Sequence, residues 1–306
     1  MSGSGDEDEQ KCETDAHGAI LQSGPLNALS LALILVAALV HIVPHAAIKG
    51  AADRTAFVWW MLGGTVVLYV PALWLDVMPA PRAWLLILAS GAVEVVYLLS
   101  ISRAYSTGDL SVVYPLARGS APLFLIVFSL FVLREPLTRA GAGGVLLIAA
   151  GVYLVGGGHL FGLPRSAGLG WAATAGLTTA LYTTIDKIGV RYVHPLTYIY
   201  LVMLVSWIFY TPVTLLRSGR QGIRATLTAS PLRVALAAAA MPLAYALVLI
   251  AMRLGTFASY AGSVREVSVI IASAVGAVAF GERVTKLRMA GAALILAGVV
   301  LIAVSG

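Results

Sequence analysis

The sequence is short of charged residues, which make up 11% of its 306 positions. Water-soluble proteins carry roughly 25% charged residues. Hydrophobic residues make up 59% of the chain, and its mean hydropathy is +0.92. A chain of this composition cannot fold as a soluble domain, so we expect an integral membrane protein.

Cysteine is almost absent, since Cys12 is the only one. A single cysteine excludes an intrachain disulfide and a cysteine-based metal site. The sequence also lacks a Walker-type glycine loop, and its connecting segments are too short to form a nucleotide-binding domain. No nucleophile-base arrangement and no cluster of carboxylates is visible. We therefore predict no catalytic residue, no metal and no cofactor.

Acidic residues are concentrated in the first 15 positions, where Lys11 is the only basic residue. Such a segment is expected to be disordered. It has neither a basic start nor a small-residue cleavage site before the first apolar run, so we expect no signal peptide. Residues 1–27 are predicted to form an acidic, disordered N-terminal tail.

Long apolar runs fill the rest of the chain. A helix needs about 20 apolar residues to cross a hydrocarbon core of roughly 30 Å. The sequence thus predicts an all-α membrane protein with a first repeat at 28–156, a linker at 157–167 and a second repeat at 168–304. Its ten transmembrane helices are expected at residues 28–48, 57–75, 83–102, 111–133, 140–156, 168–185, 196–216, 232–252, 260–280 and 287–304.

One segment of the chain occurs twice. Residues 251–302 repeat residues 104–155 without a gap, at a shift of 147 positions (251 minus 104). Five predicted helices per half is an odd number, so the two five-helix repeats are inverted relative to each other. Inverted repeats are common in secondary transporters, which bind substrate where the halves meet. The matched pairs are Ala104 and Ala251, Gly108 and Gly255, Arg118 and Arg265, Glu135 and Glu282, Gly144 and Gly291, and Gly151 and Gly298.

The same repeat carries a family resemblance. An acid follows the fourth and the ninth predicted helix, Glu135 within Leu133–Glu135 and Glu282 within Phe280–Glu282, and a glycine-rich helix follows each acid. The chain from 28 to 304 thereby resembles the EamA family of the drug/metabolite transporter (DMT) superfamily. The resemblance implies a carrier of small metabolites or drugs, often an exporter, that works by alternating access.

Membrane orientation is predicted in two conflicting ways. The family resemblance implies cytoplasmic termini, and we expect the protein in the bacterial plasma (inner) membrane. With that orientation, however, inside segments hold seven Lys and Arg residues and outside segments hold eleven. The positive-inside rule favours the reverse. Because this charge bias is weak, we adopt cytoplasmic termini as the expectation.

Four charged residues lie well inside the predicted spans, away from the first two residues at either end, and charges inside a membrane normally face a cavity or a partner. Glu94 and Arg118 lie at similar depth on either side of the turn between the third and fourth helices, which predicts an ion pair across this hairpin. The mirror position of Glu94 is Met241, so Arg265 has no such partner. We predict that Arg265 binds the acidic group of a substrate and that Arg118 assists it. The fourth charge, Glu266, points away from Arg265 around the helix.

Two alternatives remain open for these charges. All four can pair with one another and serve only to hold the helices in register. A desolvated carboxyl group can also carry a coupling proton, for which Glu94 and Glu266 are the candidates. His41 is a third candidate, because histidine titrates near neutral pH.

Further polar and aromatic residues surround these positions. His41 and His45 are four residues apart and share a helix face with Lys49. This face is predicted either to line the permeation path or to pack against another helix near the membrane edge. We predict His45 as a substrate-binding residue and expect no metal between the two histidines. The tyrosines predicted to bind substrate are Tyr97, Tyr114 and Tyr260.

The duplicated acids Glu135 and Glu282 are predicted to be structural. They follow their helices, and their simplest role is to complement the positive N-terminal ends of the fifth and tenth helices, together with Thr138 and Thr285. Both of these helices are rich in small residues that let backbones approach closely. They are predicted to be packing or dimer faces rather than cavity walls.

The sequence therefore predicts a secondary active transporter of small organic anions or zwitterions, such as amino acids. Alternatives are an intramembrane enzyme acting on a lipid-linked head group, an exporter of cationic or apolar drugs, and a membrane scaffold whose internal charges are structural. The expected partners are a small-molecule substrate and the lipid bilayer, and the small-residue faces leave a homodimer open; no nucleic acid is expected.

Overall fold

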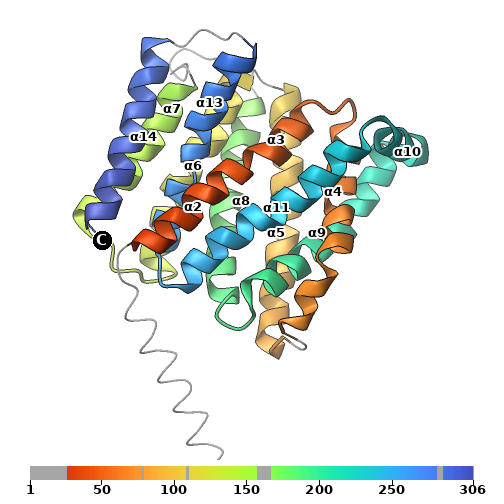
Figure 1. Cartoon of the computed structure of the whole chain (residues 1–306), viewed down its shortest axis with the longest axis horizontal. Helices are drawn as coiled ribbons and strands as arrows, with labels where there is room; N and C mark the ends of the chain where they lie inside the picture. Colours follow the sequence, from red (N-terminus) through yellow and green to blue (C-terminus); the bar gives the residue numbers. More distant parts are fainter. Residues whose placement is uncertain (1–25, 77–78, 108–109, 157–166, 281–284, 306) are drawn as a thin grey trace, which may run out of the picture.

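The computed structural model describes residues 26–76, 79–107, 110–156, 167–280 and 285–305, and every regular element among them is a helix (Figure 1). The predicted N-terminal tail and linker lie almost entirely outside the described residues. The first half contains α2 (Ala28–Val40), α3 (Ile42–Lys49), α4 (Arg54–Leu68), the short 3-10 helix η1 (Val70–Trp74), α5 (Pro81–Thr107), α6 (Leu110–Phe131) and α7 (Arg139–Val155). The second half contains α8 (Ala167–Gly189), α9 (Pro195–Arg217), α10 (Gly219–Ala229), α11 (Pro231–Arg253), α12 (Ala258–Val264), α13 (Val267–Phe280) and α14 (Lys286–Ser305).

Each predicted span coincides with a helix or with two consecutive helices, and α10 is the one described helix that was not predicted. Helix starts follow ordinary capping chemistry. The side chain of Asn27 accepts a hydrogen bond from the Ser30 backbone N–H at 2.7 Å, and that of Asp53 accepts one from Ala56 at 3.0 Å. The helices α9 and α11 begin with a proline, whose missing N–H is not needed there.

Three of the predicted spans are divided between two helices, and in the second span the α-helix α4 gives way to the 3-10 helix η1. The first breaks at His41, between α2 and α3, where Pro44 cannot donate a hydrogen bond to the carbonyl four residues earlier. The ninth breaks at Arg265 and Glu266, between α12 and α13, without a proline. There the backbone N–H of Glu266 bonds to the Ser263 carbonyl at 2.9 Å, a tighter turn than that of an α-helix.

The surface of the bundle is apolar. Val67, Leu85, Leu216 and Val304 are between 72% and 88% exposed, which would be a liability in water and is expected against lipid. Five helical stretches of the described chain are long and apolar enough to cross a membrane, and three shorter helices are also apolar. The structure thus supports a helical membrane protein, and the number of ten spans stays a prediction. The five long stretches are Ala28–Ile48, Pro81–Ala104, Pro195–Arg217, Pro231–Arg253 and Lys286–Ser305.

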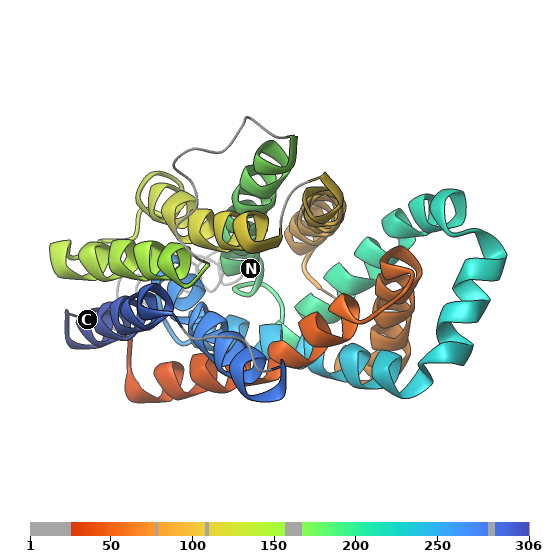
Figure 2. The ribbon, with the colours of Figure 1, turned by 90° about the horizontal axis from the view of Figure 1, so that it is seen from above.

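Helices of the two halves interleave rather than forming separate bundles. Seen from above, α7 and α14 lie side by side at one end of the molecule, and α4, α9, α10 and α11 form the other end (Figure 2). Between them, α8 of the second half packs along both α5 and α6 of the first half. Residues from both halves therefore meet in the middle of the bundle.

The contact between α7 and α14 is a seam of glycines. A Cβ added to Gly144 would lie 2.7 Å from the Gly298 carbonyl oxygen, and one added to Gly151 would lie 2.6 Å from that of Gly291. The partners repeat these contacts in reverse. Because Gly144 matches Gly291 and Gly151 matches Gly298 in the sequence repeat, the two contacts are related by a two-fold axis. The small residues of these helices thus pack within one chain.

Candidate functional site

A small cavity lies where α3, α5, α6, α8 and α11 approach one another. Its volume is about 20 Å³, which is room for roughly one water molecule. Its walls come from both halves of the chain and include the break in the first span. The lining residues are His41, His45, Tyr97, Ile101, Ala117, Arg118, Ala121, Thr179, Tyr182 and Met241.

Arg118 joins the two halves at this cavity. Its Nη1 lies 3.3 Å from Oε1 of Glu266, and both side chains are buried. Its Nη2 lies 3.1 Å from Nε2 of His45. The predicted ion pair between Glu94 and Arg118 is therefore wrong, since Arg118 pairs with an acid of the second half.

The carboxylate of Glu94 contacts α9 instead, where its Oε2 accepts a hydrogen bond from the Ser206 hydroxyl at 3.1 Å. The hairpin prediction fails because α8 packs along both arms of the hairpin, so that α5 and α6 have little contact with each other. Glu94 and Arg118 are equally far from the turn in the sequence, but this did not imply that their side chains face each other.

The two histidines form a defined hydrogen-bond arrangement. Nε2 of His45 lies 2.9 Å from Nε2 of His41 as well as close to Arg118. A guanidinium can only donate, so Nε2 of His45 must be an acceptor, and the proton between the two rings belongs to His41. This assignment makes His45 neutral, and its protonation would remove the acceptor that Arg118 uses.

Arg265 differs from its matched residue. It is 2% exposed and lies at the break between α12 and α13. Its Nε is buried without a hydrogen-bond partner, and its guanidinium lies over the ring of Tyr245 at 5.8 Å from the centroid. Oε2 of the adjacent Glu266 is also buried without a partner. One hydrogen-bond donor and one acceptor are thus left without a hydrogen-bond partner at this break.

Asp186 is a buried acid that the sequence analysis missed. Its carboxylate accepts hydrogen bonds from the hydroxyl groups of Ser90 at 2.5 Å, Tyr198 at 2.9 Å and Tyr245 at 2.6 Å. These residues belong to α5, α9 and α11, so Asp186 on α8 ties four helices together. The residue was missed because the sixth span was predicted to end at 185, whereas α8 continues to Gly189.

Lys187, the next residue, is buried as well. Its Nζ donates to the carbonyl oxygens of Met252 at 2.7 Å and Thr256 at 2.8 Å. These carbonyls lie at the C-terminal end of α11 and in the turn before α12, where a positive charge is favourable. Like Asp186, Lys187 lies beyond the predicted end of the sixth span at 185.

The tyrosines predicted to bind substrate lie in different parts of the structure. Tyr97 lines the cavity and packs edge-to-face against Tyr182, which packs in the same way against Tyr245, with centroids 6.0 and 5.8 Å apart. Tyr260 does not border the cavity, because it is fully buried against Gly141 of α7 and Phe257.

The side chain of Tyr114 lies outside the described residues. Tyr182 was also near the polar positions in the sequence, whereas nothing in the sequence set Tyr245 apart from the other tyrosines.

Glu135 contacts a helix other than the predicted one. Both of its carboxylate oxygens accept from the Ala258 backbone N–H, at 2.9 and 3.1 Å, so it satisfies the start of α12 rather than that of α7. Burial raises the pKa of Glu135, while the charge of Lys187 and the backbone N–H of Ala258 act to lower it. Its repeat partner Glu282 lies outside the described residues.

The two threonines take the capping role that was predicted for them. Thr138 accepts a hydrogen bond from the backbone N–H of Gly141 at 2.9 Å, at the start of α7. Thr285 accepts one from Arg288 at 3.2 Å, at the start of α14. The same cap therefore occurs in both halves.

Within the described residues, no three side chains of His, Cys, Asp or Glu gather as a metal site would require. The described part of the bundle centre contains a cation paired with a carboxylate, a second cation without a carboxylate partner, two histidines and a buried acid. This arrangement can recognise an anion and can change its pairing when a proton binds.

Comparison with known proteins identifies a family and a fold. The sequence model of the EamA-like transporter family matches twice, over residues 24–157 and 166–304. A solved structure described as "Crystal structure of protein" superposes with a TM-score of 0.67, covering 90% of this chain and 95% of that chain at 15% identity. At such identity the likeness shows the fold alone. No curated protein matches the sequence.

Proposed function

The chain belongs to the EamA-like transporter family, and we propose that it is a secondary active transporter of small organic anions or zwitterions, such as amino acids. The observation that carries the proposal is Arg265, a buried cation with an unused donor at a helix break. Broken helices at the meeting point of inverted repeats are where secondary transporters bind substrate.

The two arginines of the site have separate roles in this proposal. Arg118 is neutralised by Glu266, so it holds the halves together in the absence of substrate. Arg265 keeps its fork of donors, which fits a carboxylate in a bidentate manner. A substrate carboxylate would supply the partner that Arg265 lacks.

Movement of the helices is part of the proposal. Pockets that hold small organic ligands have volumes of roughly 300–1,000 Å³, and the central cavity has about 20 Å³. Substrate entry therefore requires the walls to separate. The breaks at His41 and at Arg265 are the natural places for this movement, since fewer backbone hydrogen bonds hold the helices straight there.

Glu266 is our choice among the candidates for proton coupling. When protonated it would lose its attraction for Arg118, and that arginine would become available to the substrate. Binding of substrate and binding of a proton would then favour each other, as thermodynamic reciprocity requires. Glu94 and His41 remain alternatives, and Glu266→Gln should uncouple uptake from a proton gradient while leaving exchange of substrate intact.

The test is thermal stability of the purified protein against amino acids, organic acids, phosphonates and cationic drugs. A ligand that binds the folded state raises the melting temperature. We expect an acidic or zwitterionic compound to do so, and Arg265→Gln to abolish the shift. Arg253→Gln is the matched control, because Arg253 lies exposed at the end of α11 and makes a 3.5 Å contact with the Val193 carbonyl.

Other outcomes would overturn the proposal. Stabilisation by cationic compounds alone, equal in wild type and Arg265→Gln, would favour a drug exporter with Asp186 or Glu94 as the recognising acid. Conversion of a lipid-linked compound to a product would favour an enzyme. Uptake of the stabilising ligand into proteoliposomes would separate a transporter from a binding scaffold.

We further propose that both termini face the cytoplasm. The count of Lys and Arg residues favours the opposite, so the question needs a direct measurement. Cys12 is the only cysteine and lies near the N-terminus, which makes it a natural reporter. A membrane-impermeant maleimide should label it after permeabilisation of cells and not before, and labelling of intact cells would reverse the orientation.

A further inference from the structure

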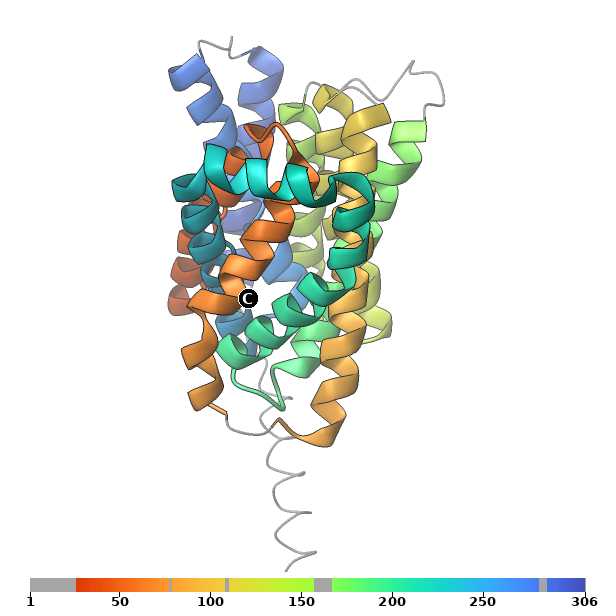
Figure 3. The ribbon, with the colours of Figure 1, turned by 90° about the vertical axis from the view of Figure 1, so that its right-hand side faces the viewer.

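The helix α10 is placed differently from its neighbours. The axis of α10 lies across the bundle, whereas α4 and α9 run along the length of the bundle (Figure 3). Gly219, with a φ of +61°, turns the chain out of α9 into this helix. At Gly219–Ala229 it is too short to span a membrane, and helices of this kind lie in the interface between headgroups and acyl chains.

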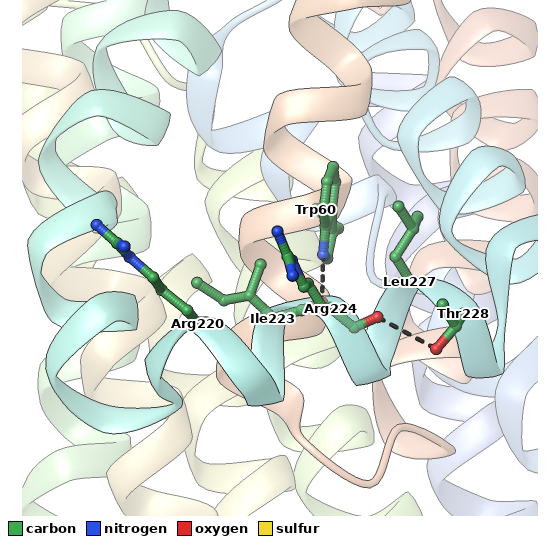
Figure 4. Close-up of a pocket in the computed structure, with 6 residues that line it drawn as sticks. All are labelled: Trp60, Arg220, Ile223, Arg224, Leu227 and Thr228. Atoms are coloured by element: carbon green, nitrogen blue, oxygen red, sulfur yellow. Dashed lines mark hydrogen bonds between the residues drawn. The ribbon is translucent and has the colours of Figure 1, made fainter.

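An open groove separates α10 from α4. It has a volume of about 430 Å³ and is lined almost entirely by apolar surface. Trp60 of α4 stands over it and is fixed by a 2.7 Å hydrogen bond from its Nε1–H to the Ile223 carbonyl (Figure 4). The lining residues are Trp60, Arg220, Ile223, Arg224, Leu227 and Thr228.

Two arginines border this groove. Arg220 and Arg224 are four residues apart, both exposed, and project on the same side of α10 (Figure 4). Within the described part of the chain, neither guanidinium has a carboxylate partner. The carboxylate of Asp53 accepts the Ala56 N–H at the start of α4, and its Oδ2 lies close to α10, 3.1 Å from a Cβ added to Gly222. The rim of the groove thus carries two arginines, and among the described residues this one nearby acid pairs with neither of them.

The apolar surface that faces lipid continues up to this groove. Leu215 and Leu216, at the end of α9 just before α10, are 48% and 88% exposed. Tryptophan at a membrane boundary typically sits at the level of the headgroups, where its ring is half apolar and half polar. The groove thus has an apolar floor next to acyl chains and a cationic rim next to headgroups.

We propose that this groove binds an anionic phospholipid of the surrounding leaflet. The phosphate lies between Arg220 and Arg224, and the start of an acyl chain lies along Trp60, Ile223 and Leu227. An arginine fork matches phosphate oxygens, and each basic residue near an anionic membrane surface adds to the attraction. The site is separate from the central cavity and does not depend on the transported substrate.

Lipid binding is measured with the detergent-solubilised full chain and lipids brominated on the acyl chain, which quench nearby tryptophan. Phosphatidylglycerol should quench at a lipid concentration roughly five- to thirtyfold lower than phosphatidylcholine, given the contribution of two basic residues. Because exposed tryptophans such as Trp74 are quenched by either lipid, Trp60→Phe should remove only the part of the quenching that prefers phosphatidylglycerol. Arg220→Gln/Arg224→Gln should abolish the preference for phosphatidylglycerol.

The matched control is Arg217→Gln/Arg233→Gln, which removes the same charge from the same end of the molecule outside the groove and should keep the preference. Equal losses in both double variants would mean a diffuse charge effect and overturn the site. Equal quenching by both lipids would mean that the groove binds acyl chains without recognising the headgroup, and would also overturn the proposal. Displacement of phosphatidylglycerol by inorganic phosphate alone would show a soluble-anion site and also overturn the lipid proposal.

Discussion

The seam between α7 and α14 and the centre of the bundle use the same sequence repeat in opposite ways. At the seam, Gly144 and Gly298 meet in the same manner as Gly151 and Gly291, so the two halves contribute equally. At the centre, Arg118 and Arg265 are matched just as well in sequence but differ in state. One is paired with Glu266, and the other has an unpartnered Nε.

The difference comes from the position that follows each arginine. Glu266 follows Arg265, whereas Gly119 follows Arg118, and a Cβ at Gly119 would lie 3.3 Å from the Ala149 carbonyl. The first half uses this position for close packing against α7, and the second half uses it for a charge. A single acid thus neutralises the arginine of the opposite half and leaves its own neighbour unpaired.

The largest expected effect is at this central pair. Glu266→Ala removes the carboxylate that pairs with the buried Arg118 and should cost about 3–5 kcal/mol of folding stability. Arg265→Ala should cost far less, because no ion pair is lost. Unfolding in mixed micelles with increasing denaturing detergent measures both. Similar losses of stability in the two variants would contradict the assignment of Arg118 as the arginine paired with Glu266 and of Arg265 as the arginine without an ion pair.

The double variant Arg118→Leu/Glu266→Leu controls for lost packing. Replacing both partners of a buried pair by apolar residues is often neutral or stabilising. We therefore expect it to recover most of the stability that Glu266→Ala loses. A double variant as unstable as the single one would mean that the pair itself is not what Glu266 contributes.

The seam should respond next, and equally from both sides. Gly144→Ala and Gly291→Ala place a methyl group against a facing carbonyl and should each cost about 1–3 kcal/mol. Gly170→Ala, on α8 with no atom within 4 Å of the added Cβ, should be neutral or slightly stabilising. Thermal unfolding of the three variants compares them, and a large difference between the two seam variants would break the symmetry argued here.

The smallest effect concerns the helix caps. Thr138→Ala and Thr285→Ala each remove one cap of matched geometry, at the start of α7 and of α14, and should each cost about 0.5–2 kcal/mol. Hydrogen exchange of the first turn of each helix is the sensitive measurement. Unequal costs would show that the neighbourhood of the caps, rather than the repeat, decides their strength.

Features encoded locally were predictable from the sequence. Long apolar runs located the helices, and the repeated glycines located the packing faces of α7 and α14. The helix α10 was missed because its arginines and threonines interrupt any apolar run, and an amphipathic helix this short resembles a loop. Asp186 was missed because its three hydroxyl partners come from three distant helices.

Side-chain partners across the bundle were not predictable. Glu94 and Arg118 had equal depth, but depth says nothing about which helix lies between two others, and α8 packs along both of theirs. Glu135 was assigned to the helix that follows it in sequence, and its acceptor role is at α12, brought close by the fold. The comparison of the two halves that singled out Arg265 assumed the Glu94–Arg118 pair, and Arg118 turns out to have no hairpin partner either, since it pairs with Glu266.

The glycine seam has a consequence for energetics. A contact that maps onto itself under a half-turn has the same free energy when the two halves exchange roles. If the carrier alternates between inward- and outward-facing forms by such an exchange, the seam adds equally to both forms and cancels from their equilibrium. Whatever makes one form more populated must then reside in residues without a matching counterpart, of which Glu266 is the clearest.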